Sequence, residues 1–241
     1  MKLERSRIRA LGALVIVLSF VAGSALADVS EVVLRITASS GRGTSVLEIT
    51  ADQGTWEGDN FFWSPSEDIP LMSGDQVVGT IVKDESYIAI YSDPQIAMGF
   101  SFQAGDTPTD VIVTSGVLSF PTIAEATARA DAAFTVMGSG VSLVGLHAGG
   151  GAYRAYYNDS VTFAEAIGPI TAGPTEFAVG DFAYPGGGAY LPIGSVSNMG
   201  AEIAFTLSAN GFASGSSNFE IVPEPAGLLL LALGVCVLRR R

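Results

Sequence analysis

The feature that most constrains the fold of this chain is a strict alternation of apolar residues with other residues, which recurs from residue 29 to residue 222. Residues 32–36 and 96–102 are clear examples, because every second position holds Val, Leu, Ile, Met or Phe. Successive side chains of a β-strand point to opposite faces, so this pattern predicts strands that bury one face. The same argument predicts further strands over residues 45–50, 76–82, 86–92, 111–120 and 201–208.

The segment from Ala124 to Met137 is rich in alanine, which favours a helix. Its pattern nevertheless has a period of two, with alanine or another apolar residue at the even positions and charged or polar residues at most odd positions. A helix would spread those charges around its circumference. We therefore predict a strand whose small inward side chains let an opposite sheet pack closely.

Turn-forming residues separate the expected strands. Lys83-Asp84-Glu85 and Asn210-Gly211 are predicted to be hairpin turns, the second because Asn and Gly accept a positive φ. One short helix is predicted after Asn158-Asp159-Ser160, because Thr162 and Glu165 have the spacing of a capping box. Three glycine-rich segments are predicted to be surface loops, namely residues 149–151, 168–188 and 194–200.

Many short strands with almost no helix predict an all-β fold, an antiparallel β-sandwich of the jelly-roll kind. The sequence shows no internal repeat, which argues against a propeller or a solenoid. A helix is expected at each end of this body. The predicted organisation is residues 1–27 as a signal peptide, residues 28–220 as the β-sandwich, and residues 221–241 as a sorting and anchor segment.

The first 27 residues have the three parts of an export signal. Basic residues precede an apolar run from Ala10 to Ala22, and Ala25-Leu26-Ala27 then supplies small residues at the positions that signal peptidase reads. We predict cleavage after Ala27. The alternative is an uncleaved membrane anchor, although the apolar run is shorter than the about 20 residues of a full span.

The last residues combine a motif, a short apolar run and a basic end. Pro223-Glu224-Pro225 precedes the apolar residues 226–238, and Arg239, Arg240 and Arg241 follow. Prolines stop a helix, and arginines stay on the cytoplasmic side of a membrane. Together these features predict a short transmembrane helix with the body outside, and an ordinary tail anchor is the alternative.

This arrangement resembles the PEP-CTERM sorting signal of exported bacterial proteins. The resemblance implies recognition and cleavage by an exosortase after a transient stay in the inner membrane. It also implies release to the cell surface or to the extracellular polysaccharide matrix. Signal peptidase and exosortase are therefore the expected processing partners, and polysaccharide is a further candidate partner.

Charge excludes some partners of the body. Residues 28–222 hold five basic residues and twenty-two acidic ones, a net charge of −17. Such an acidic surface repels phosphate, so no nucleic acid is expected as a partner. The one cysteine, Cys236, lies in the tail. The body must therefore be stable without disulfide bonds.

No set of residues in the body forms a convincing catalytic or metal site. His147 is the only histidine, which excludes zinc sites built on two histidines and leaves only a relay with an unidentified serine and aspartate. Residues 52–60 gather oxygen ligands without the regular spacing of a calcium loop, and a solvated turn is the preferred interpretation. We expect no cofactor, no metal and no enzymatic activity.

Aromatic residues give the only candidate ligand surface. Trp56, Phe61 and Trp63, with Phe62, cluster beside turn residues, and flat exposed rings can stack on sugars. The predicted function is therefore that of a non-catalytic surface or matrix protein processed through its tail. A carbohydrate-binding module is the alternative, and a hydrolase comes third.

Overall fold

The computed structural model describes residues 28–173 and 177–224, and within them the chain is all β. Eighteen strands carry the fold, and the two helical elements are 3₁₀ turns of three residues, so the predicted fold class is confirmed at this level. The strands are β1 (Asp28–Val29), β2 (Val32–Ser40), β3 (Gly43–Thr50), β4 (Thr55–Glu57), β5 (Asn60–Trp63), β6 (Ile69–Ser73), β7 (Gln76–Ile81), β8 (Tyr87–Tyr91), β9 (Gln95–Ala104), β10 (Thr109–Ser115), β11 (Leu118–Met137), β12 (Ser142–Gly145), β13 (Tyr153–Tyr157), β14 (Val161–Ala166), β15 (Ile170–Thr171), β16 (Phe177–Tyr184), β17 (Leu191–Leu207) and β18 (Phe212–Pro223). The 3₁₀ turns are η1 (Lys83–Glu85) and η2 (Gly186–Gly188).

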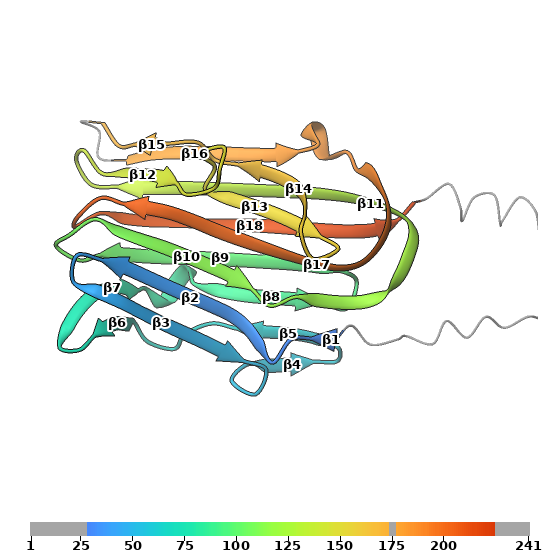
Figure 1. Ribbon diagram of the computed structural model, residues 1–241, viewed down its shortest axis with the longest axis horizontal. Coiled ribbons are helices and arrows are strands. Elements are labelled where there is room, and N and C mark those ends of the chain that lie inside the picture. The colour runs from blue at the N-terminus through green and yellow to red at the C-terminus, as the bar shows by residue number, and fades with distance from the viewer. Residues whose placement is uncertain (1–27, 174–176, 225–241) are drawn as a thin grey trace, which may run out of the picture.

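The first half of the fold is a ladder centred on β17, here called the β17 ladder. On one side of β17, β10 pairs with it directly, β2 pairs with β10, and β3 pairs with β2. Strands β12 and β13 pair with the other edge, and β15 and β14 lie beyond them. Every pair is antiparallel (Figure 1).

The second half is a ladder centred on β18, the β18 ladder. Strand β18 pairs with β9 on one side and with β11 on the other, and β16 pairs with the far edge of β11. Strands β8 and β7 pair with different parts of the other edge of β9. Strand β5 then pairs with β8 and β4 with β5, while β6 pairs with β7. These pairs are antiparallel as well.

Strand β11 belongs to both ladders and curls one over the other. Its residues 118–128 pair with β17, through a series of register shifts, and its residues 126–137 pair with β18. The predicted strand is confirmed, and its period of two holds from Ala128 onward, whereas Ala124 is exposed and Thr127 is buried. Alanines 126, 128, 130 and 132 are at most 3% exposed and point into the core, as the small-residue argument required.

The core lies between the two ladders. Phe100 of β9 contacts Phe205 of β17 with ring centroids 5.1 Å apart, and Phe163 of β14 stacks on Phe219 of β18 at 5.4 Å. All four rings are buried. Each buried aromatic or aliphatic side chain of this size stabilises the fold by about 2 kcal/mol, so an extensive core of this kind needs no disulfide.

Both ends of the described chain lie at the same end of the molecule (Figure 1). Asp28 and Val29 of β1 pair with Ser119 and Leu118 of β11. Pro223, the last residue of β18, pairs with Ala126, which also belongs to β11. The turn between β2 and β3 lies at the opposite end.

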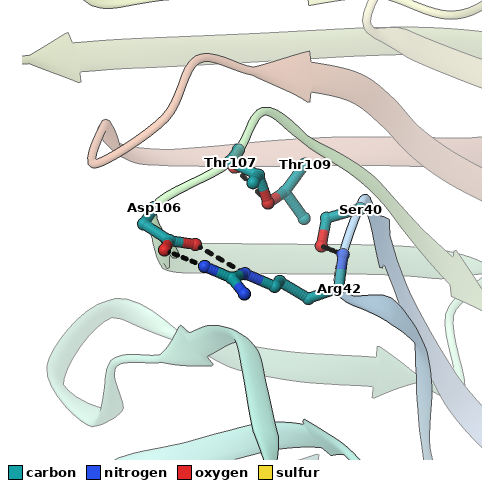
Figure 2. A network of polar contacts seen from close by, with 5 residues as sticks. All are labelled: Ser40, Arg42, Asp106, Thr107 and Thr109. Atoms are coloured by element: carbon teal, nitrogen blue, oxygen red, sulfur yellow. Dashed lines mark hydrogen bonds and ion pairs between the residues drawn. The ribbon is translucent and has the colours of Figure 1, made fainter.

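An ion pair connects two turns at the end of the molecule opposite the two termini of the described chain. Arg42, after β2, holds the carboxylate of Asp106, which lies between β9 and β10 (Figure 2). The Arg42 backbone N–H also donates to Ser40 Oγ, and Thr109 Oγ1 donates to the carbonyl of Thr107. Since both charged groups face solvent, the pair orients these turns more than it stabilises the fold.

Two predicted hairpins are wrong. Strands β7 and β8 do not pair with each other. Strand β7 pairs with residues 102–104 of β9, and η1 then carries the chain along the same edge, where β8 pairs with residues 95–99. The turn at Asn210-Gly211 does have a positive φ of 55° at Asn210. It nevertheless crosses from the β17 ladder to the β18 ladder, because Leu207 is already paired with β10 and with β12.

The predicted short helix and two of the predicted loops are strands. Asn158 and Asp159 both adopt positive φ, as tight hairpin turns require, and they join β13 to β14 in place of capping a helix. Residues 194–200 lie inside β17, and the stretch 168–188 contains β15 and β16. Residues 149–151 form the predicted loop.

The structure contradicts the predicted transmembrane helix and the inner-membrane anchoring that depended on it. Within residues 28–173 and 177–224, no helix is long and apolar enough to cross a membrane. The helical elements of that part, η1 and η2, have three residues each, which at about 2 Å per residue cover about 6 Å of the about 30 Å needed. The segments that carried the signal-helix and tail-helix predictions, residues 1–27 and 226–238, lie outside the described residues.

Candidate functional site

The three aromatic residues predicted to stack on sugars do not form an exposed surface. Phe61 is fully buried, and Trp63 packs against the core. Trp56 is 45% exposed, but its indole N–H donates to the carbonyl of Ala51 and its ring meets Phe61 edge-on at 5.3 Å. Trp63 is partly buried and reaches the surface at the hollow described next, so the three residues do not share one exposed face.

An aromatic surface exists on the opposite face of the same strands. Phe62 lies between Phe61 and Trp63 in β5, so its side chain points away from the core. It pairs with Ala89 of β8, and Tyr87 and Tyr91 flank Ala89 on that outer face. The three rings line a hollow of about 420 Å³, here called the outer groove, together with the polar residues Gln53, Thr55 and Ser64.

The rings of the outer groove form a corner and not a flat platform. Phe62 and Tyr91 lie 5.6 Å apart at an interplanar angle of 85°. Burial raises the pKa of the Tyr87 hydroxyl, and the neighbouring Tyr91 adds to the shift. That hydroxyl therefore stays protonated at neutral pH and can both donate and accept a hydrogen bond.

A second hollow of about 350 Å³ continues the outer groove across the sheet. Tyr87 lines both hollows, and the second is completed by Glu85, Thr135, Ser214 and Ser216. The Tyr87 ring lies over Gly99 of β9, where a Cβ atom would come within 2.3 Å of it. The absence of a side chain at Gly99 therefore gives the Tyr87 ring its position.

His147 is buried beside a partly exposed ion pair between Arg154 and Glu202. Its side chain is 5% exposed, and its Nδ1 is 3.7 Å from Glu202 Oε1, which also accepts from Arg154 Nη2 at 3.0 Å. Burial lowers the pKa of His147, and the charge of Arg154 lowers it further. His147 Nε2 has no hydrogen-bond partner, so no serine is placed for a relay with this imidazole.

The oxygen-rich loop of residues 52–60 is a connection and a short hairpin. Asp52 accepts a hydrogen bond from the hydroxyl of Thr50, and Thr55–Glu57 pair with residues 60–62. Within the described part of the chain, no group of three or more His, Cys, Asp or Glu residues is close enough to hold a metal ion.

The predicted sorting motif begins inside the fold. Ile221 is fully buried, Pro223 still pairs with β11, and the Glu224 N–H donates to the carbonyl of Glu125 at 2.8 Å. The strand therefore continues three residues beyond the predicted boundary at residue 220. Pro225, Arg239, Arg240 and Arg241 lie outside the described residues, as do Ala25 and Ala27 of the predicted signal cleavage site.

The sequence contained a signal for the outer groove that the aromatic cluster obscured. Within the predicted strand 86–92, Tyr87, Ala89 and Tyr91 alternate with Ile88 and Ile90. If the isoleucines face the core, the tyrosines must face solvent. The pairing that places Phe62 beside them joins strands distant in sequence, and no local pattern reveals it.

Comparisons with known proteins give no family for this chain. No family model matches it, and no curated protein matches it. One solved structure with a weak likeness is VP2 in the subviral particle of infectious bursal disease virus, at 13% identity and a TM-score of 0.14. The match covers 80% of this chain and 66% of VP2, so it spans slightly less than two thirds of that protein. A likeness this low carries no argument about fold or function.

Proposed function

We propose that this chain is an exported, non-catalytic protein of the cell surface or extracellular matrix. In this proposal a signal peptidase removes residues 1–27 and an exosortase processes the tail at its Pro-Glu-Pro motif. The curled sheet is proposed to be a β-sandwich of the jelly-roll kind, since its two ladders face each other across one core.

The positions of the two ends of the fold support this proposal best. The first strand begins at Asp28, directly after the predicted cleavage site, and the last strand ends at Pro223, in the motif. The residues between them pair into complete ladders and enclose a core. An exported body that both enzymes leave intact requires such an arrangement. The resemblance of residues 223–241 to a PEP-CTERM signal supplies the identity of the second enzyme.

Mass spectrometry of the mature protein tests the proposal. The exported form, isolated from a host that contains an exosortase, is expected to begin at Asp28 and to lack Arg239–Arg241. The variant Glu224→Gln is expected to accumulate unprocessed chain. The matched control is Glu125→Gln, because Glu125 contacts Glu224 through its backbone but lies outside the motif. A surface fraction that retains Arg239–Arg241 would overturn the processing proposal.

Carbohydrate binding is the second candidate function. The observation that favours it is the outer groove, in which aromatic rings and uncharged polar groups share one exposed hollow. A matrix location would bring this groove into contact with polysaccharide. This candidate does not depend on how the tail is processed.

A further inference from the structure

We infer that the outer groove and the second hollow together bind a neutral polysaccharide chain that runs across the strands of the β18 ladder. The inference rests on the second candidate function above, for which it names the residues and the chemical class of the ligand. It replaces Trp56 and Phe61 by Phe62, Tyr87 and Tyr91, and it keeps Trp63, which also lines the outer groove.

The aromatic corner suits the amphipathic faces of a sugar ring. A pyranose presents C–H groups on its faces and hydroxyls around its rim, so it packs on an aromatic ring and forms hydrogen bonds at its edges. Phe62 and Tyr91 meet at 85° and can contact one sugar from two sides. Gln53, Thr55 and Ser64 line the same hollow and supply donors and acceptors for hydroxyls.

The path beyond the corner is long enough for several sugar units. Tyr87 pairs with Gly99, Gly99 with Ser216, and Ser216 with Ala133, so these residues form one row across four strands. With β5 included, the path crosses five strands, and at about 4.8 Å between neighbours it is about 19 Å long. The Tyr87 ring covers Gly99, and beyond it Ser216 and Ala133 have small exposed side chains, which keep the path open.

The charge of the site selects against anionic glycans. Among the residues that the structure describes, no Lys or Arg lines either hollow, and Glu85 lines the second one. The body around them carries a net charge of −17 over residues 28–222. An anionic polysaccharide would meet repulsion without a compensating cation, whereas a neutral polysaccharide meets none.

Affinity electrophoresis of the purified full-length chain tests the inference. Native gels contain one soluble polysaccharide each: hydroxyethylcellulose, galactomannan, laminarin or dextran as neutral probes, and alginate as the anionic probe. Retardation is expected with at least one neutral probe and not with alginate. The inference is overturned if no neutral probe retards the chain, or if alginate retards it more strongly than all of them.

Variants locate the site. Phe62→Ala and Tyr91→Ala are each expected to weaken the binding about tenfold, the loss that one stacking contact of about 1.4 kcal/mol predicts. Tyr91→Phe is expected to retain most of the affinity. Trp56→Ala is the matched control, since Trp56 is an exposed aromatic residue that lines neither hollow. Loss of binding in Trp56→Ala with full binding in Phe62→Ala would restore the site predicted from the sequence and overturn this one.

A further variant separates binding from folding. Ser216→Tyr adds a ring to the open path from an exposed position and leaves the aromatic corner intact. It is expected to reduce binding at least fivefold while the thermal unfolding midpoint stays unchanged. Unchanged binding in this variant would contradict the proposed path. Processing of the tail is read from the mass of the mature chain, so failure of either proposal is seen independently of the other.

Discussion

Among the described glycines, Gly145 leaves the least space for a side chain. A Cβ atom at this position would lie 2.1 Å from the carbonyl carbon of Gly151 and 2.3 Å from the carbonyl oxygen of Gly150. Both neighbours are backbone atoms, so no side-chain rotation can relieve the contact. The loop of residues 149–151 can therefore pack on β12 only because residue 145 has no side chain.

The variant Gly145→Ala is expected to lower the free energy of unfolding by about 3 kcal/mol, the upper part of the usual cost of overpacking. Urea unfolding followed by circular dichroism measures the change. Gly186→Ala is the control, because a Cβ at residue 186 would meet nothing within 4 Å and its φ is not positive. Equal stability of the two variants would show that the loop moves away without cost.

Because of His147, the free energy of unfolding is expected to depend on pH below about 6.5. Burial holds its pKa in the folded state below the value of about 6.5 for an unfolded chain. As the pH falls below about 6.5, the unfolded state gains a proton that the folded state resists, so the free energy of unfolding decreases. Glu202 and Glu165 oppose the shift and Arg154 reinforces it, and burial is the largest cause.

The expected result is a fall in the unfolding midpoint between pH 7 and pH 5.5 that is smaller in His147→Asn. The quantity compared is the slope of the midpoint against pH, so a uniform loss of stability in the variant does not affect the test. Parallel slopes for the two proteins would mean that His147 takes up its proton equally in both states.

At this scale the sequence singled out the aromatic segment 56–63, and whether it binds a ligand stays a prediction. The structure buries Phe61 and places Phe62 and Trp63 along the outer groove. Applying the period-two rule to the cluster would have separated Phe61 from Phe62. Tyr87 and Tyr91 join Phe62 through a long-range pairing between β5 and β8, which residue patterns do not encode.

Among the elements, β11 shows where period and composition disagree. Its twenty residues include the alanine-rich segment that intrinsic propensity would make helical, yet buried and more exposed positions alternate from Ala128 to Met137. Packing decides the outcome, because each inward alanine faces a buried core and each strand edge has a partner.

Enlarging one of those alanines is expected to be costly. Ala132→Leu places three more carbon atoms in a position that is 3% exposed, and we expect it to lower the free energy of unfolding by about 2 kcal/mol. Ala133→Leu, one residue further on the exposed outer face, is expected to change it by less than about 0.5 kcal/mol. Chemical denaturation of both variants checks the difference, and equal effects would contradict the assignment of faces.

The predictions that failed at the element scale concern connections. Lys83–Glu85 and Asn210-Gly211 have the composition of hairpin turns, but composition sets only the local bend. Whether the following strand pairs with the preceding one depends on which edges are already occupied, as at Leu207. The helix predicted from the capping-box spacing of Thr162 and Glu165 is absent for a similar reason, because Asn158 and Asp159 form a hairpin turn that pairs this segment with β13.

In the whole molecule, β18 both contributes to the core and forms the C-terminal end of the described fold. It pairs with β9 and β11 over its length and buries Phe219 and Ile221. A chain that stops after Glu224 keeps every one of these contacts. A chain that stops after Gly211 loses them all and leaves one edge of β9 and one edge of β11 without a partner strand.

Truncation should therefore have a sharp limit. Mature chains that end at Glu224 and at Arg241 are expected to unfold at the same temperature, and a chain that ends at Gly211 is not expected to fold. Circular dichroism with a thermal ramp measures all three. A lower midpoint for the chain ending at Glu224 would mean that the tail stabilises the body, which is inconsistent with a tail made to be removed.

The shared location of Asp28 and Pro223 gives the molecule a fixed polarity. Both ends of the described chain therefore leave the body on the same side, and a partner domain fused to either end would lie on that side. The two turns that the Arg42–Asp106 ion pair connects lie on the opposite side, so such a fusion would leave them uncovered.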